Sequence, residues 1–290
     1  MSYKIAVVSG KGGTGKTTIS VQLAMFFSQK TKSKVRLVDC DVEEPNDGLF
    51  FPNKKKLESK TIYQSIAEID VNKCRFCRDC VAYCNFNAIV VIPPVRFAQV
   101  EKTLCHSCGA CIVACRHNAI NEVPESIGVV NSYQINPRLS LMEGELRIGS
   151  PMQTMLIKAL KKEVVNQDNI IIFDAPPGTS CSVVETISDA QTVIVVTEPT
   201  PFGLHDLKLT VELLRDMQKP FGVVVNKAGL GNNDLLEYLE KEKIQLIDSI
   251  PFSKEVAAKY ASGELLKKLD ENMMILFSDW WNQVKEMETV

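Results

Sequence analysis

The chain has 290 residues, 45% of them hydrophobic, which is long enough for one large α/β domain and a small additional module. Its formal net charge is -2 with basic and acidic residues interspersed, which argues against nucleic-acid binding. No run approaches the roughly eighteen apolar residues that span a bilayer, and ten cysteines in such a chain predict a reducing, cytoplasmic compartment.

The N-terminal segment has the pattern of a βαβ unit. Residues 3–9 predict a buried strand, residues 16–30 a helix and residues 34–39 a second strand. Because the first strand begins at once, we expect no cleaved signal segment before it.

A glycine-rich loop, Ser9–Thr17, leads from the first predicted strand into the predicted helix and fits two motifs. Gly10, Gly12 and Gly15 satisfy the dinucleotide pattern GxGxxG, with Asp39 where a ribose-binding acid would stand. The loop also fits GxxxxGK[ST], and Lys16 and Thr17 favour this reading because only a triphosphate site needs an ammonium and a Mg²⁺-binding hydroxyl. The loop residues predicted to hold phosphate are Gly12, Gly13, Thr14, Gly15, Lys16, Thr17 and Thr18.

Acidic residues follow two of the predicted strands. Asp174 ends the strand at 169–174 in front of Pro-Pro-Gly, a loop suited to sense the γ-phosphate, and Asp39 ends the second strand. We expect Asp39 and Asp174, with Thr17, to hold Mg²⁺ directly or through water, and Asp41 to orient the attacking water. An ordinary turn aspartate is the alternative for Asp41.

The identity of the base follows from a later segment. Guanine recognition usually requires NKxD, and this chain has Asn226-Lys227-Ala228-Gly229, which lacks the final acid. The sequence therefore favours adenine, with Asn226 on the nucleotide side.

The middle of the chain contains a duplicated cysteine pattern, CxxCxxCxxxC, whose copies are offset by 31 residues. Three thiolates spaced by two residues can hold one [4Fe-4S] cubane, while the fourth reaches the other cluster. The first predicted ligand set is Cys74, Cys77, Cys80 and Cys115. The second is Cys105, Cys108, Cys111 and Cys84.

Two alternatives for these cysteines are a disulfide framework and a pair of zinc sites. The crossed spacing of two complete sets favours clusters over both. The bacterial pattern has proline after each fourth cysteine, and here Asn85 and Arg116 stand instead. Proline is not a ligand, so we expect ligation to be unaffected.

The α/β pattern resumes after the cysteines. It predicts a strand at 146–150, a helix at 152–166, and strands at 169–174, 192–197, 221–226 and 245–250. Strands that alternate with helices predict an α/β fold with a doubly wound, mostly parallel sheet. We therefore expect an ATPase domain of residues 1–62 and 124–290, with residues 63–123 as an inserted ferredoxin-like domain.

The C-terminal stretch is amphipathic. On a helix one face would carry Met273, Leu276, Phe277, Trp280 and Val284. This face suits packing against the core or a membrane surface, and an excess of acids over bases in residues 264–290 favours packing. We expect no stable membrane anchor.

Several segments together resemble a known family. GKGGTGKT, with the additional Lys11, is similar to the deviant Walker A loop of the MinD/ParA/Mrp superfamily of P-loop ATPases. LVDCDVEEPN resembles the first switch of that superfamily and FDAPPGTS the second. VTEPTPFGLHDLK and VVVNKAG resemble its later nucleotide-side segments. With the cysteine insert, the whole chain resembles the members that contain an inserted bacterial-type 2[4Fe-4S] ferredoxin.

The resemblance implies a role for Lys11. In the superfamily this lysine contacts the partner subunit's nucleotide, which implies a homodimer in the ATP state and Mg²⁺-dependent ATP hydrolysis, with Lys11, Lys16 and Asp41 as the catalytic residues. A related iron protein has a cluster-binding cysteine just beyond its Walker B aspartate. In this chain the corresponding aspartate is Asp174, and Cys181 follows it. Only Cys40 remains as its companion, so a third cluster is not favoured.

Three functions fit these patterns. The first is an ATPase, slow and coupled to a partner, that links dimer switching to electron transfer through two [4Fe-4S] clusters. The second is an Mrp-like carrier that delivers a cluster to an iron-sulfur client protein during ATP turnover. The third is a positioning switch of the MinD or ParA type, which needs no metal. We favour the first, because eight thiolates in ferredoxin order predict clusters that are poor donors.

Overall fold

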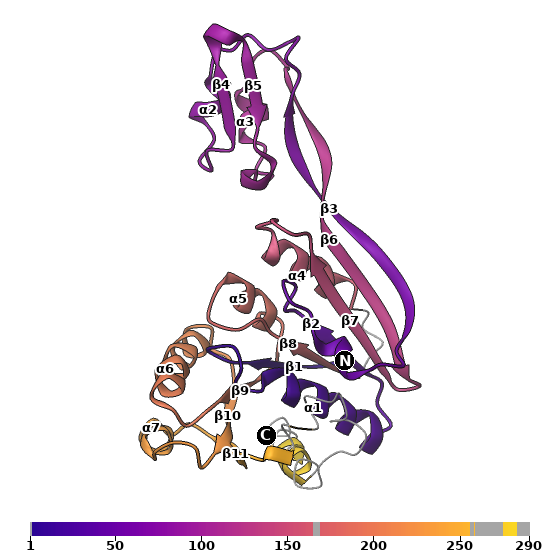
Figure 1. Ribbon diagram of the computed structural model, residues 1–290, viewed down its shortest axis with the longest axis vertical. Helices are drawn as coiled ribbons and strands as arrows, with labels where there is room; N and C mark the ends of the chain where they lie inside the picture. Colours follow the sequence, from indigo (N-terminus) through magenta and orange to yellow (C-terminus); the bar gives the residue numbers. More distant parts are fainter. Residues whose placement is uncertain (1, 165–168, 256–257, 259–274, 283–290) are drawn as a thin grey trace. The chain divides into compact units, whose positions relative to one another are not determined.

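The computed structural model describes residues 2–164, 169–255, 258 and 275–282, and Figure 1 follows the chain from indigo to yellow. The chain divides into two compact units. Unit 1 comprises residues 1–59, 130–145 and 157–290, and unit 2 comprises residues 60–129 and 146–156. The domain predicted for residues 63–123 lies within the range of unit 2, which additionally takes in the segment 146–156.

The elements alternate between strands and helices except in the middle of the chain. The strands are β1 (Tyr3–Val8), β2 (Val35–Asp39), β3 (Lys55–Ile69), β4 (Ile89–Ile92), β5 (Phe97–Val100), β6 (Ile120–Asn136), β7 (Leu139–Leu146), β8 (Ile170–Asp174), β9 (Thr192–Thr197), β10 (Phe221–Ala228) and β11 (Leu246–Pro251). The α-helices are α1 (Lys16–Lys30), α2 (Asp79–Ala82), α3 (Ala110–Ala114), α4 (Gln153–Lys162), α5 (Cys181–Ile187), α6 (Pro201–Asp216) and α7 (Asp234–Lys241).

The main sheet has the strand order β11-β10-β9-β1-β8-β2-β7-β6-β3. Every neighbouring pair from β11 to β7 is parallel. Only Pro137 and Arg138 join β6 to β7, and so short a connection requires these neighbours to be antiparallel. The prediction of a mostly parallel α/β sheet is confirmed.

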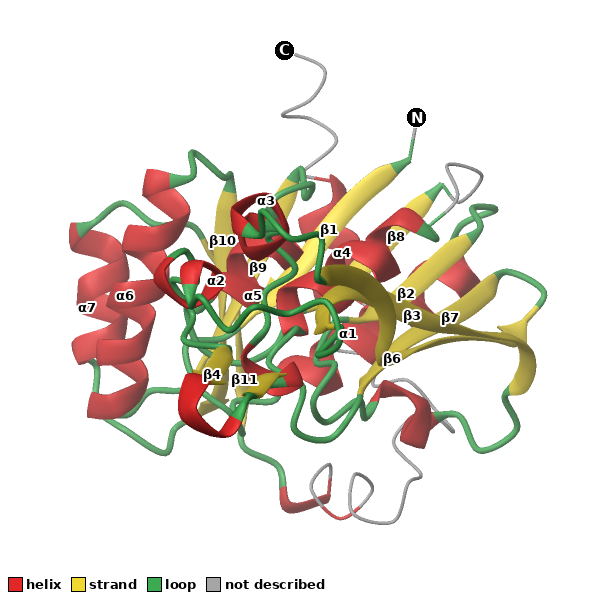
Figure 2. Ribbon diagram, turned by 90° about the horizontal axis from the view of Figure 1, so that it is seen from above, coloured by secondary structure: helices red, strands yellow, loops and turns green. Residues whose placement is uncertain are grey.

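Helices cover the parallel strands, as such strands require. Helix α1 contacts β1, β2 and β8, while α5 contacts β1 and α6 contacts β9. Alternate strand residues such as Ile5 and Leu37 share one core cluster with Phe27 of α1. Their neighbours Ala6 and Val38 are also fully buried, so both faces of the sheet are covered (Figure 2).

One expectation for the segment after the cysteines was wrong. The strand predicted at 146–150 does not form: β7 ends at Leu146, and Ile148 is fully exposed in a turn. The helix predicted near 152–166 is present and spans Gln153–Lys162. The sequence also did not predict the long strands β3 and β6.

The C-terminal helical segment packs against the core. Residues 275–282 are helical, and Leu276, Phe277 and Trp280 belong to the core cluster that contains α1. Met273 and Val284 of the predicted face lie outside the described residues. Among the described helices, none is long and apolar enough to cross a bilayer.

Phe277→Ala tests the packing role of this segment. Phe277 is 1% exposed and its ring lies 5.7 Å from that of Phe26, so we expect the free energy of unfolding to fall by about 3 kcal/mol. The matched control is Ile275→Ala, because Ile275 is 61% exposed, and its effect should stay within about 0.5 kcal/mol. Urea unfolding of both variants measures the difference, and equal losses would refute the packing role.

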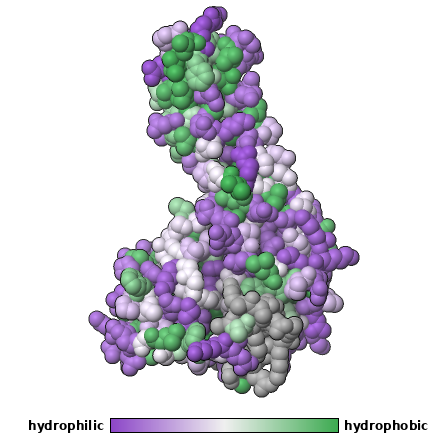
Figure 3. All heavy atoms as spheres, viewed as in Figure 1, coloured by the Kyte–Doolittle hydropathy of each residue, from purple (hydrophilic) through white to green (hydrophobic). Residues whose placement is uncertain are grey.

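Unit 2 contains a second, two-stranded sheet in which β4 and β5 are antiparallel. Side chains alternate across this ribbon: Ile89, Val91, Ala98 and Val100 are buried, whereas Val90, Ile92 and Phe97 are exposed. Figure 3 shows apolar residues, in green, gathered over this part of the unit. Contiguous exposed apolar side chains are typical of interaction surfaces.

Candidate functional site

The glycine-rich loop connects β1 to α1 and has a backbone that requires glycine. Gly15 caps α1 with φ 95°, and a Cβ there would lie 2.3 Å from Nδ2 of Asn226. That amide donates a hydrogen bond of 2.7 Å to the carbonyl oxygen of Thr14. Asn226, predicted to face the nucleotide, therefore holds the loop itself. Gly12 and Gly13 are exposed, and Thr17 and Thr18 are half-buried on the first turn of α1.

Lys16 is buried in the first turn of α1 beside Asp174. Its Nζ lies 2.9 Å from Oδ1 of Asp174. The hydroxyl groups of Thr17 and Ser20 donate to Asp174 at 2.8 and 2.6 Å. Burial alone would lower the pKa of Lys16, but the carboxylate of Asp174 outweighs it and the pKa is raised. The lysine is therefore charged and paired with Asp174.

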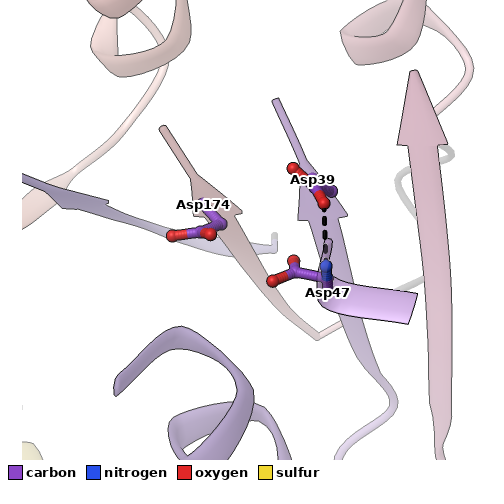
Figure 4. A group of neighbouring side chains, drawn as sticks. All are labelled: Asp39, Asp47 and Asp174. Atoms are coloured by element: carbon purple, nitrogen blue, oxygen red, sulfur yellow. Dashed lines mark hydrogen bonds between the residues drawn. The ribbon is translucent and has the colours of Figure 1, made fainter. Parts of the chain in front are cut away.

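Three fully buried carboxylates, those of Asp39, Asp47 and Asp174, form the centre of the site (Figure 4). One oxygen from each lies within 4.8 Å of the others. Asp39 accepts hydrogen bonds from the backbone N–H groups of Asp41, Asn46 and Asp47 at 3.0, 2.8 and 3.0 Å. Among the described residues, neither carboxylate oxygen of Asp47 has a hydrogen-bond partner.

Burial and neighbouring acids destabilise the charged forms of Asp39 and Asp47. Burial and then the charge of Asp174 raise the pKa of Asp39 to about 8. Burial and then the charge of Asp39 raise the pKa of Asp47 well above its ordinary value. Among the described residues, the ammonium of Lys16 lies beside these acids, and a divalent cation, which would favour their charged forms, fits such a buried set of oxygens.

Asp47 was not predicted from the sequence. It opens the short 3-10 turn Asp47–Phe50, where an acid is an ordinary residue. Asp41, predicted to orient water, lies outside the group of three carboxylates. It is half-buried, and burial raises its pKa to about 6.

Lys11 is held within its own chain. Its Nζ donates to Oε1 of Glu198 at 2.5 Å, and Nζ of Lys227 donates to Oε2 of the same carboxylate at 2.9 Å. Lys227 also donates to the carbonyl oxygen of Gly13 at 2.7 Å. Burial would raise the pKa of Glu198, but the hydrogen bonds from Lys11 and Lys227 outweigh it and hold the pKa low. The sequence did not single out Glu198 or Lys227 for this contact.

The eight cysteines of the duplicated pattern line two cavities in unit 2. We call them cavity A and cavity B, and each is lined by one predicted ligand set. Cavity A is lined by Cys74, Cys77, Cys80 and Cys115. Cavity B is lined by Cys84, Cys105, Cys108 and Cys111. In each case the fourth cysteine comes from the other copy of the pattern.

The cysteine geometry bears on the alternatives. All ten cysteines are free, so the disulfide framework is wrong. Four thiols around one cavity are a donor set for a cubane and also for tetrahedral zinc, and the crossed pairing of the two copies is what favours the cubane.

Cys40 and Cys181 belong to neither cavity. Cys40 is fully buried after β2, and burial raises the pKa of its thiol well above the ordinary value. Cys181 is exposed at the start of α5. Neither joins a group of metal-ligating side chains among the described residues.

The chain has relatives among known proteins. The family model for the CobQ/CobB/MinD/ParA nucleotide binding domain matches residues 5–266. An uncharacterized protein of Methanocaldococcus jannaschii is 32% identical, over 98% of this chain and 96% of that protein. A cytosolic Fe-S cluster assembly factor NUBP2 homolog of Dictyostelium discoideum is 43% identical, over 79% of this chain and 68% of that protein.

The fold has solved counterparts. The cell division ATPase MinD of Pyrococcus furiosus aligns with a TM-score of 0.59 at 16% identity, over 98% of this chain and 100% of that one. At this identity the likeness concerns the fold alone. The chain belongs to the CobQ/CobB/MinD/ParA family of P-loop nucleotide-binding proteins.

Proposed function

We propose that the protein is an ATPase that carries two [4Fe-4S] clusters and couples nucleotide-dependent dimerisation to electron transfer to a partner protein. The observation that carries this proposal is the pair of cavities, each lined by four cysteines from both copies of the pattern, in one chain with a phosphate loop. When bound, the clusters would supply one-electron chemistry at low potential. The eight cysteines of cavities A and B would hold them.

The nucleotide half of the proposal rests on α1 and its loop. The backbone amides of residues 12–18 are suited to cradle phosphates, and Lys16 is suited to neutralise them once it leaves Asp174. Thr17, Asp39 and Asp174 would hold Mg²⁺, and Asp41 would orient the attacking water. Asp47 is a further oxygen donor for the cation, because its two buried oxygens have no other partner among the described residues.

Asp47→Asn tests this assignment in the nucleotide-free protein. For the wild type, Mg²⁺ at a hundredfold excess over its dissociation constant should add about 2.7 kcal/mol of stability, seen as a rise in the melting temperature. In Asp47→Asn we expect less than half of that Mg²⁺-dependent rise, because one buried ligand charge is gone. Asp41→Asn is the control, since Asp41 lies outside the group of three carboxylates. Equal Mg²⁺ effects in wild type and Asp47→Asn would refute the role of Asp47.

The switching half of the proposal rests on Lys11. In the ATP state Lys11 would leave Glu198 and contact the nucleotide of a second copy of the chain. Hydrolysis would then remove the phosphate contacts that hold the dimer and release the copies. Dimerisation would thus vary with the phosphate state of the bound nucleotide.

A second candidate function is ATP-dependent cluster delivery. The name of the Dictyostelium relative, an Fe-S cluster assembly factor, favours it. Cys80, Cys105 and Cys111 are buried, which opposes it, because a transferable cluster needs accessible or shared ligands. Cys77 and Cys108 are exposed, one in each cavity, which favours it, so the expectation that ligand burial would rule out delivery is wrong. In either case the partner is a redox or iron-sulfur client protein, and we expect a cytoplasmic location without nucleic acid or a membrane anchor.

Anaerobic reconstitution separates the two functions. We expect about eight iron atoms per chain, electron paramagnetic resonance signals of reduced [4Fe-4S] clusters, and a midpoint potential or electron-transfer rate that changes when ATP is added. Loss of the clusters to an apo-ferredoxin during ATP turnover would favour delivery instead. A colourless, iron-free protein would refute both.

A further inference from the structure

Unit 2 repeats its backbone as well as its cysteines. Residues with positive φ recur at the offset of 31: Phe76 and Ser107 both have φ 55°, and Arg78 and Gly109 have 70° and 72°. A pair of hydrogen bonds repeats too, since Asp70 N–H donates to Ala119 at 2.8 Å and Glu101 N–H donates to Ala88 at 2.7 Å. Cavities A and B are therefore two versions of one backbone scaffold, which makes their side chains directly comparable.

The charged side chains of the two cavities differ. Arg75 and Arg78 line cavity A, and the equivalent positions of cavity B are His106 and Gly109. Cavity A also has Asp79, which lies 3.8 Å from Arg116. The histidine among the lining residues of cavity A is His117.

Cavity B has one acid and no arginine among its lining residues. Its charged member is Glu122, and the ring of His106 stacks on Phe86 with centroids 3.9 Å apart. With neutral histidines, the lining side chains of cavity A carry a formal charge of +1 and those of cavity B carry -1.

The difference in charge between the two linings would change the stability of the reduced state of a bound cluster. Reduction adds one negative charge, which nearby cations stabilise and nearby anions destabilise. Backbone N–H groups act in the same direction as cations. In cavity A, Cys74 and Cys115 accept such bonds from Phe76 and Ala119, each at 3.4 Å, and in cavity B, Cys84 accepts one from Ala88 at 3.4 Å.

We propose that Arg75 and Arg78 make the two cysteine sites electronically unequal, so that the cluster in cavity A has the higher reduction potential and receives the first electron. The inference rests on the two clusters of the proposed function. One electron from a low-potential donor reduces the site of cavity A and oxidises that donor. The site of cavity B is reduced only at lower potential, so an electron that enters there passes on to cavity A.

A potentiometric titration of the anaerobically reconstituted full-length protein, followed by electron paramagnetic resonance, tests the proposal. We expect two separate one-electron waves. The double variant Arg75→Gln, Arg78→Gln should lower the potential of the upper wave and leave the lower one in place. At a fixed potential we expect the ratio of reduced to oxidised cluster in cavity A to fall about tenfold, which equals a shift of 59 mV for a one-electron couple. Because both arginines are exposed, this shift should decrease at high salt.

Gly109→Arg is the complementary variant, because it gives cavity B the residue that Arg78 is in cavity A. A Cβ at Gly109 would meet no atom within 4 Å, and Arg78 adopts the same backbone conformation. This variant should raise the lower wave. Lys32→Gln, which removes an exposed charge from unit 1, is the control and should move neither wave.

The outcomes separate this inference from the proposed function. Iron content and signal intensity establish whether two clusters are present, and their absence would refute the proposed function. Two clusters with one shared potential would overturn the inference alone. A shift of the lower wave in the arginine double variant would overturn it as well.

Discussion

The double variant Cys84→Ala, Cys105→Ala should keep about half of its iron after anaerobic reconstitution, whereas Cys84→Ala, Cys74→Ala should keep almost none. Cys84 and Cys105 line the same cavity, so their joint loss removes one site and leaves about four iron atoms. Cys74 lines the other cavity, so its loss together with that of Cys84 damages both sites. Iron and sulfide analysis of the purified proteins gives the result.

The two double variants are matched controls for each other, because each removes two thiols from the same small unit. Cys181→Ala adds a neutral control, since Cys181 lines neither cavity, and it should keep all of its iron. Cys84 belongs by sequence to the first copy of the pattern. Ligation within each copy, without crossing, would produce the opposite result for the two double variants and would refute the crossed assignment.

The sequence predicts those parts of the fold in which local pattern and burial agree. Residues 5–8 of β1 and 170–173 of β8 are continuous apolar runs because helices cover both sides of the sheet there. Strand β3 could not be predicted in this way: most of its residues are exposed, so it has no hydrophobic period, and it pairs with β6, far away in the sequence. The wrong strand at 146–150 has a related cause, since Ile148 is apolar but fully exposed.

The residues of the candidate site also differ in whether the sequence predicts them. The phosphate loop and the cysteine sets are short patterns whose spacing has a chemical meaning, so a sequence can reveal them. Asp47 and Glu198 are single acids in a turn and a loop, without a spacing that signals a role. Only the folded chain brings Asp47 beside Asp39 and Glu198 onto Lys11.

Lys11→Ala should retain ATP binding but lose the ATP-induced dimer. In the part of the chain that the structure describes, the side chain of Lys11 pairs with Glu198, which lies outside the three-carboxylate group, so its removal leaves Lys16 and the loop amides in place. The cross-subunit phosphate contact proposed for Lys11 would be absent. We therefore expect ATP affinity to change by less than about threefold and hydrolysis to fall at least about a hundredfold. Light scattering with ATP and Mg²⁺ measures dimerisation, and an unchanged dimer would refute the role of Lys11.

Glu198→Gln should act in the opposite direction, because the carboxylate that holds Lys11 must release it before the lysine can reach a second chain. The Lys11 side chain in this ion pair is 32% exposed, so the pair contributes on the order of 1 kcal/mol or less. Two such pairs are released in each dimer, so their loss should lower the protein concentration needed for ATP-induced dimers by up to about thirtyfold. Lys227→Gln distinguishes the effect of Lys227 from that of Lys11. It leaves the Lys11–Glu198 pair intact and removes the hydrogen bonds from Lys227 to Glu198 and to the loop at Gly13. If Glu198→Gln weakened the dimer, Glu198 would instead be part of the dimer contact, and the intrachain hold on Lys11 would have to be abandoned.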